Sequence, residues 1–146
     1  MLSAIRHLLG RLRGSISDRR RAPRYEARLF FSVSIVDETA DHENMRPSQT
    51  LVGRTRNVSE TGFGLIVPSL WLGAHKLNEE NATLRLMLNV PDALEPVEIH
   101  VVPVRSFQLG EDEKESGYFI GAQITHLSDE ARAPFTKLLR GLGSRH

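Results

Sequence analysis

The chain contains six strand-like segments followed by one amphipathic segment, and this order limits the folds that it can adopt. The six segments either alternate apolar with polar residues or are rich in β-branched and aromatic ones. Short connections with turn-forming residues favour antiparallel pairing. We therefore expect a mainly β fold, a six-stranded antiparallel (split) β-barrel with a C-terminal helix. The segments are residues 28–37, 50–58, 63–67, 82–90, 97–109 and 118–124.

The final segment carries the signals of an α-helix. Ser128 followed by Asp129 and Glu130 predicts a helix N-terminus. Pro134 lacks a backbone N–H, so we expect a short first turn and a restart of the helix near Ala133. The apolar face at helical spacing consists of Phe135, Leu138, Leu139 and Leu142.

Residues 1–18 form a separate unit ahead of a domain that we place at residues 19–143. Leucines and Ile5 recur at helical spacing between Leu2 and Leu12, among three arginines, and predict a short amphipathic helix. Three alternatives stay open for this helix. It packs on a partner or a second copy, makes weak contact with an anionic membrane surface, or is disordered.

Composition excludes several classes of function. The chain of 146 residues has the length of one domain and contains no cysteine, which excludes disulfides and thiolate chemistry. It has neither a bilayer-spanning apolar run nor a secretory signal, so we expect a cytoplasmic protein. The histidines lack metal-ligand spacing, and there is no P-loop or Ser-His-Asp set. We expect no enzyme activity, no metal and no cofactor.

Charge is distributed unevenly along the chain. The first 28 residues contain eight arginines and two acidic residues, whereas the rest of the chain is net acidic. A basic arm on an acidic body indicates an anionic partner at the arm.

Four of these arginines lie just ahead of the first strand, in the segment Arg-Arg-Arg-Ala-Pro-Arg at residues 19–24. The arginine fork matches phosphate oxygens and also the O6/N7 edge of guanine. Pro23 biases Ala22 away from helix, so Arg20 and Arg24 lie on a non-helical arm and can reach different parts of one ligand. A solvated basic tether is the alternative explanation.

A second polar segment, Asn-Val-Ser-Glu-Thr-Gly at residues 57–62, occupies the turn between the second and third predicted strands. Asn57 and Ser59 can present an amide and a hydroxyl to a base edge or a phosphate. Gly62 can adopt a positive φ and let another group approach the backbone. Since the same residue types favour turns for local reasons, this segment alone indicates only a turn.

Together the two segments resemble the double signature of the PilZ family, an RxxxR arm followed one strand pair later by [D/N]xSxxG. Arg20 and Arg24 match the first part, and Asn57, Ser59 and Gly62 match the second. The resemblance extends from residue 19 to about residue 140, because residues 119–124 and the helix that begins at Ser128 look like the closing segment of the family.

This resemblance implies a receptor for the bacterial second messenger cyclic di-GMP. In the family, the arginines of the arm contact the phosphates and guanines of the ligand, and the barrel turn supplies further contacts. When these roles are assigned to the matching residues of this chain, Arg20 and Arg24 bind the phosphates and the guanine edges. Asn57 binds the Watson–Crick side of a guanine. Ser59 donates a hydrogen bond to the ligand, and Gly62 shapes the turn. Secondary candidates are Arg19 and Arg21.

The resemblance also implies an output. Ligand would pin the arm onto the barrel and change a surface seen by an unidentified protein partner, and so regulate motility, exopolysaccharide synthesis or biofilm formation. Two alternatives stay open, a PilZ-type adaptor that binds no ligand and a small barrel that binds single-stranded nucleic acid. The acidic body and the 6% aromatic content argue against DNA or RNA. We expect Trp71 in the core or capping the barrel.

Overall fold

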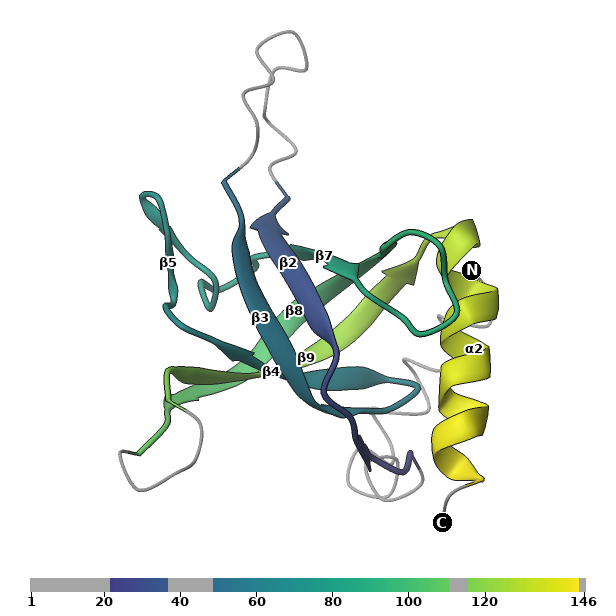
Figure 1. The fold of residues 1–146 in the computed structure, drawn as a ribbon. Coiled ribbons are helices and arrows are strands. Elements are labelled where there is room, and N and C mark those ends of the chain that lie inside the picture. Colours follow the sequence, from purple (N-terminus) through teal and green to yellow (C-terminus); the bar gives the residue numbers. More distant parts are fainter. Residues whose placement is uncertain (1–21, 37–48, 111–115, 145–146) are drawn as a thin grey trace, which may run out of the picture.

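The computed structural model describes residues 22–36, 49–110 and 116–144 (Figure 1). The predicted N-terminal helix lies outside the described residues, as do residues 37–48 and 111–115. Among those described, no helix is long and apolar enough to cross a membrane. The elements are β1 (Tyr25–Glu26), β2 (Phe30–Ile35), β3 (Leu51–Val58), β4 (Gly62–Val67), β5 (Trp71–Leu72), β6 (His75–Lys76), β7 (Leu84–Leu88), β8 (Val97–Gln108), β9 (Tyr118–Leu127) and α2 (Asp129–Gly143).

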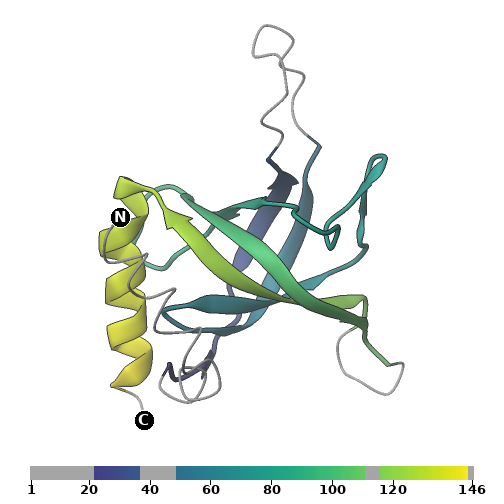
Figure 2. The same ribbon diagram turned by 180° about the vertical axis from the view of Figure 1, so that it is seen from behind.

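Six of the strands close into an antiparallel barrel, as predicted. The order around the barrel is β3-β2-β7-β8-β9-β4, and β4 pairs back onto β3. The short strand β1 also pairs with β3, with Tyr25 opposite Val58, and β2 continues along the same strand with Phe30 opposite Arg54. Figures 1 and 2 show the strands wrapping around a common interior with α2 beside them.

Aliphatic side chains from every barrel strand fill the interior. Their period-two alternation places one face of each strand inside, where burial of apolar area stabilises the fold by about 25 cal/mol per Å². A barrel of this size has an interior just wide enough for side chains. A ligand therefore has to bind on the outside. Almost fully buried residues include Val33, Val58, Leu65, Leu86, Ile99 and Ile120.

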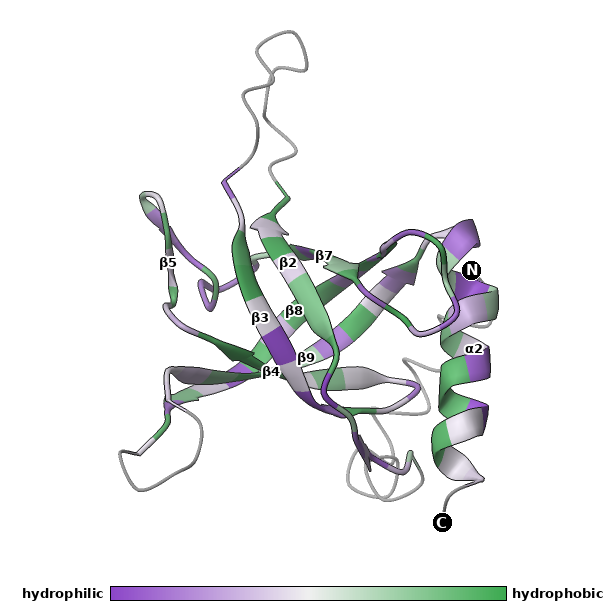
Figure 3. Cartoon of the chain, in the orientation of Figure 1, coloured by the Kyte–Doolittle hydropathy of each residue, from purple (hydrophilic) through white to green (hydrophobic). Residues whose placement is uncertain are grey.

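The helix α2 packs its apolar face on the barrel. The Ser128 side chain caps its N-terminus as predicted, since Oγ accepts the Ala131 backbone N–H at 3.2 Å. Phe135 is buried, with its ring centroid 5.7 Å from that of Phe63 on β4. Figure 3 shows hydrophobic and hydrophilic residues alternating around this helix.

Two expectations about local structure were wrong. The helix does not restart near Ala133 but runs unbroken through Pro134. Proline removes only the hydrogen bond to Glu130, an exposed first-turn residue whose carbonyl oxygen solvent can satisfy. Trp71 does not lie in the core. It is 54% exposed on the unpredicted β5–β6 hairpin, which projects from the barrel, and Lys76 Nζ lies 4.9 Å from its ring centroid (Figure 1).

Candidate ligand-binding site

Arg24, the last residue of the arm, lies beside the polar turn. Arg24 is exposed and directly precedes β1. Tyr25 lies opposite Val58 and Glu26 opposite Asn57, so one further step in this register brings Arg24 level with Ser59. The pairing of β1 with β3 therefore joins two motifs that are more than thirty residues apart in the sequence. Arg19, Arg20 and Arg21 lie outside the described residues.

The hydroxyl of Ser59 holds the turn together. Ser59 is only 3% exposed, and its Oγ accepts the backbone N–H groups of Thr61 at 3.2 Å and Gly62 at 3.1 Å. The same Oγ lies 3.2 Å from the carbonyl oxygen of Gly62, to which it can donate. A hydroxyl has a single hydrogen. Donation by Ser59 to a ligand stays a prediction and requires this hydrogen to turn away from Gly62.

Gly62 is needed for close strand approach rather than for an unusual backbone angle. Within the described part of the chain, the glycines with positive φ are Gly73 and Gly117. A Cβ on Gly62 would lie 2.2 Å from the carbonyl oxygen of Ala122 on β9. The absence of a side chain at this position therefore lets β4 and β9 pair at the start of the turn, and Gly62 does not use the positive φ that glycine permits.

A β-bulge turns Asn57 to the outside of the barrel. Thr55 pairs with Leu65 and Asn57 pairs with Gly64, so Arg56 is an extra residue on β3. The buried Thr55 hydroxyl accepts the Leu29 backbone N–H at 2.9 Å. In a regular strand, Asn57 would point to the same side as Thr55. Because the bulge adds one residue, the Asn57 side chain points outward instead.

The Asn57 amide is available to a ligand. Its Oδ1 and Nδ2 both lie 2.9 Å from the position that a Cβ on Gly64 would occupy, so the amide packs directly on this glycine. The half-buried amide makes no hydrogen bond to any other described residue. Toward the described residues, its acceptor oxygen and its two N–H donors therefore remain unused.

The same outer face carries side chains that the sequence analysis did not single out. Phe119 is 3% exposed and packs with Ile66 and Leu109 in a small apolar cluster separate from the barrel core. The exposed guanidinium groups of Arg56 and Arg105 lie over its ring, at 5.8 and 5.6 Å from the centroid. Pro103, which cannot donate a hydrogen bond to a neighbouring strand, is the one signal in the sequence that bears on this arrangement, because the register shifts between Pro103 and Arg105.

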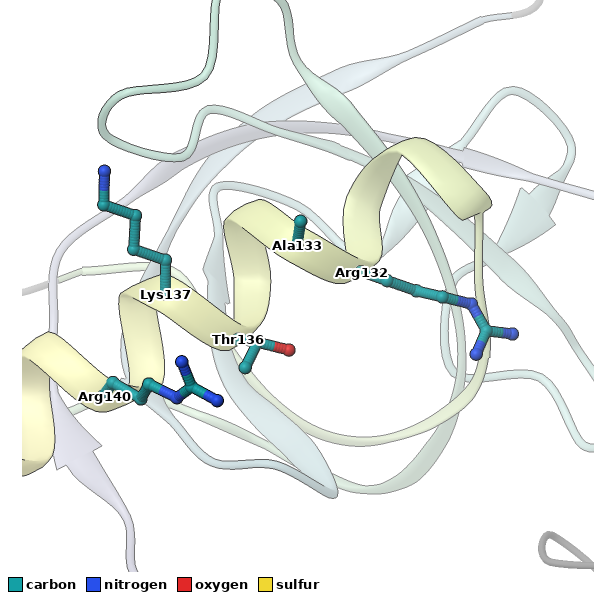
Figure 4. A pocket seen from close by; sticks show the side chains of 5 residues that line it. All are labelled: Arg132, Ala133, Thr136, Lys137 and Arg140. Atoms are coloured by element: carbon teal, nitrogen blue, oxygen red, sulfur yellow. The ribbon is translucent and has the colours of Figure 1, made fainter.

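Two hollows on the surface lie away from Asn57 and the polar turn. One runs along α2, where the charged ends of Arg132, Lys137 and Arg140 point apart instead of converging (Figure 4). The other lies between residues 26–29 and the C-terminal half of α2. Neither includes Asn57 or the turn. Among the described residues, no group of three or more histidine or acidic side chains could hold a metal ion.

Comparison with solved structures supports the architecture. The Bacillus subtilis inhibitor of motility MotI/DgrA has a TM-score of 0.53 and 18% identity, over 88% of this chain and 53% of that one. MrkH, described as a c-di-GMP dependence transcription regulatory factor, has a TM-score of 0.53 and 20% identity, over 87% of this chain and 52% of that one. At these identities the likeness shows the fold, and this chain spans about half of each.

No curated protein matches the sequence. The PilZ domain family, in contrast, matches residues 18–141, which is most of the chain and includes both polar segments. The closed barrel, the capping helix and this match agree, and the protein belongs to the PilZ domain family.

Proposed function

We propose that this protein is a receptor for cyclic di-GMP that binds the ligand on the outer face of the barrel, between the arm and the turn. The observation that carries the proposal is the register of β1 on β3, which brings Arg24 level with the turn beside an Asn57 amide with unused hydrogen-bonding groups. Membership of the PilZ family supports it, as does the likeness in fold to MrkH, which is described as a c-di-GMP dependence transcription regulatory factor.

Each matched residue has a distinct chemical role in this proposal. Arg24 and Arg20 bind phosphate oxygens or a guanine O6/N7 edge through their planar N–H forks. Asn57 accepts one N–H from the Watson–Crick edge of a guanine. Ser59 and Gly62 keep the turn in the shape that presents Asn57, through the hydroxyl hydrogen bonds and the close contact with β9.

Ligand binding then acts as a switch on the arm. The arginines at residues 19–24 repel one another, and a dianionic ligand neutralises them and holds the arm against the turn. A ligand shifts a conformational equilibrium only through different contacts in the two states, and the arm provides that difference. The repositioned N-terminal segment changes a surface seen by a protein partner, with motility, exopolysaccharide synthesis or biofilm formation as the output.

Calorimetric titration with cyclic di-GMP tests the proposal. We expect saturable binding by the wild type and at least tenfold weaker binding by Arg24→Ala, because a hydrogen bond to a charged group contributes about 1.5–3 kcal/mol. Arg132→Ala is the matched control, since this arginine lies on α2 and pairs with Asp129 at 3.7 Å. A single-stranded oligonucleotide is titrated in parallel.

The outcomes separate the alternatives. Wild-type protein that releases no heat with cyclic di-GMP and shows no thermal shift at saturating concentrations contradicts the receptor and favours the ligand-free adaptor. Binding of the oligonucleotide alone favours the nucleic-acid barrel.

A further inference from the structure

We infer that Arg56 and Arg105 form a second pair of anion-binding groups in the same site, with Phe119 as the aromatic base that positions both. This inference rests on the proposed function and extends the binding face from the turn across β4 and β9 to β8. The two arginines would contact the phosphates of the bound dinucleotide from the side opposite the arm.

Arg56 follows the buried Thr55 and faces outward by simple alternation, whereas a β-bulge on β8 turns Arg105 to the same outer face. Arg56 is the extra residue of the bulge on β3. On β8, Pro103 pairs with Ala122 and Arg105 pairs with Gly121, so Val104 is the extra residue. In a strand without a bulge, Arg105 would point inward like Pro103. The extra residue Val104 makes Arg105 point outward instead. Bulges of this kind often re-aim a side chain beside a functional site.

A pair of glycines joins Asn57 to Arg105. Gly64 and Gly121 lie opposite each other on β4 and β9, with Asn57 beside Gly64 and Arg105 beside Gly121. A Cβ on Gly121 would lie 3.2 Å from Arg105 Cγ, so the stem of this arginine lies along the glycine backbone. The four residues form one cross-strand row, about 14 Å from end to end at the usual strand spacing.

Phe119 fixes the two guanidinium groups above this row. Its Cε1 and Cε2 atoms lie 2.8 and 3.5 Å from the Cβ positions of Gly64 and Gly121, so the ring leans over both glycines. Both arginines lie within 6 Å of the ring centroid, the range of a cation–π contact. Phe107 stacks on Phe119 with a centroid distance of 4.9 Å and supports it from the β8 side.

The positive charge of this pair has no protein counter-ion in the described part of the chain. No described carboxylate oxygen lies within 4.0 Å of Arg56 or Arg105, and neither makes a hydrogen bond to another described residue. Two exposed guanidinium groups held on one ring repel each other, so an anion that bridges them is favoured. Because their stems are already positioned, less side-chain entropy is lost when they bind phosphate.

The test is calorimetric titration of the full chain with cyclic di-GMP. We expect Arg105→Gln and Arg56→Gln each to weaken binding about 10- to 100-fold, with Arg132→Gln unchanged as the matched loss of one charge on α2. Arg105→Lys keeps the charge but loses the planar fork, and we expect it to bind nearly as weakly as Arg105→Gln. Thermal unfolding without ligand accompanies each titration and should change little, since both arginines are exposed.

Each outcome decides one claim. If the wild type binds and Arg105→Gln and Arg56→Gln bind equally well, this inference is wrong and the proposed receptor stands. If Arg105→Lys binds like the wild type, charge alone acts and the planar fork of Arg105 has no role. If the wild type itself does not bind, both proposals fall.

Discussion

Replacement of Gly62 by alanine tests whether the turn is built on close contact between two strands. The added Cβ would lie 2.2 Å from the carbonyl oxygen of Ala122, about 1 Å inside ordinary van der Waals contact. The obstacle is backbone, so no side-chain rotation relieves it. Either β4 moves away from β9 at this point, or the turn held by Ser59 changes shape.

The expected cost follows from this geometry. Overpacking costs about 1–3 kcal/mol, and a rigid backbone obstacle places this site at the upper end. The φ of Gly62 is one that alanine adopts. Alanine lowers the conformational entropy of the unfolded chain, which offsets about 0.4–1 kcal/mol of this loss of stability. The net loss is about 2 kcal/mol, equivalent to about 4–8 °C in Tm for a chain of this size.

Urea and thermal unfolding of Gly62→Ala measure this loss. Gly110→Ala is the matched control, because nothing lies within 4 Å of its Cβ position and its φ is not positive. We expect this control to be as stable as the wild type or slightly more so. If Gly62→Ala unfolds at the same denaturant concentration as Gly110→Ala, close contact between β4 and β9 is not the reason why position 62 needs glycine.

Two further predictions concern the amide and the helix cap. Asn57→Asp should bind cyclic di-GMP as well as the wild type or more tightly, because a carboxylate accepts both guanine N–H groups and forms stronger hydrogen bonds. A clear loss of affinity in calorimetry would count against pairing with the guanine edge. Ser128→Ala should lower the free energy of unfolding by about 1 kcal/mol through loss of the cap to Ala131, with binding unchanged. Equal urea midpoints for Ser128→Ala and wild type would show that the cap contributes nothing.

The barrel, the C-terminal helix and the two polar segments could be predicted from the amino-acid sequence. These features rest on local signals. Alternation of apolar residues defines a strand and its buried face, Ser128 with two acidic residues defines a helix start, and the spacing of Arg20, Arg24, Asn57, Ser59 and Gly62 is read directly from the chain. Even so, the local signal at Pro134 predicted a break that the packed helix does not have, because tertiary contacts hold the helix together on both sides of the proline.

Which side chains share the outer face depends on how the strands pair, and this could not be predicted from the sequence. The directions of Asn57 and Arg105 depend on bulges, and a bulge is defined by the residue opposite it on another strand. From the sequence alone, Phe119 looks like one more core residue, yet it lies outside the core. It packs on two glycines that become neighbours only when β4 pairs with β9. These relations join residues far apart in the chain, and no local pattern contains them.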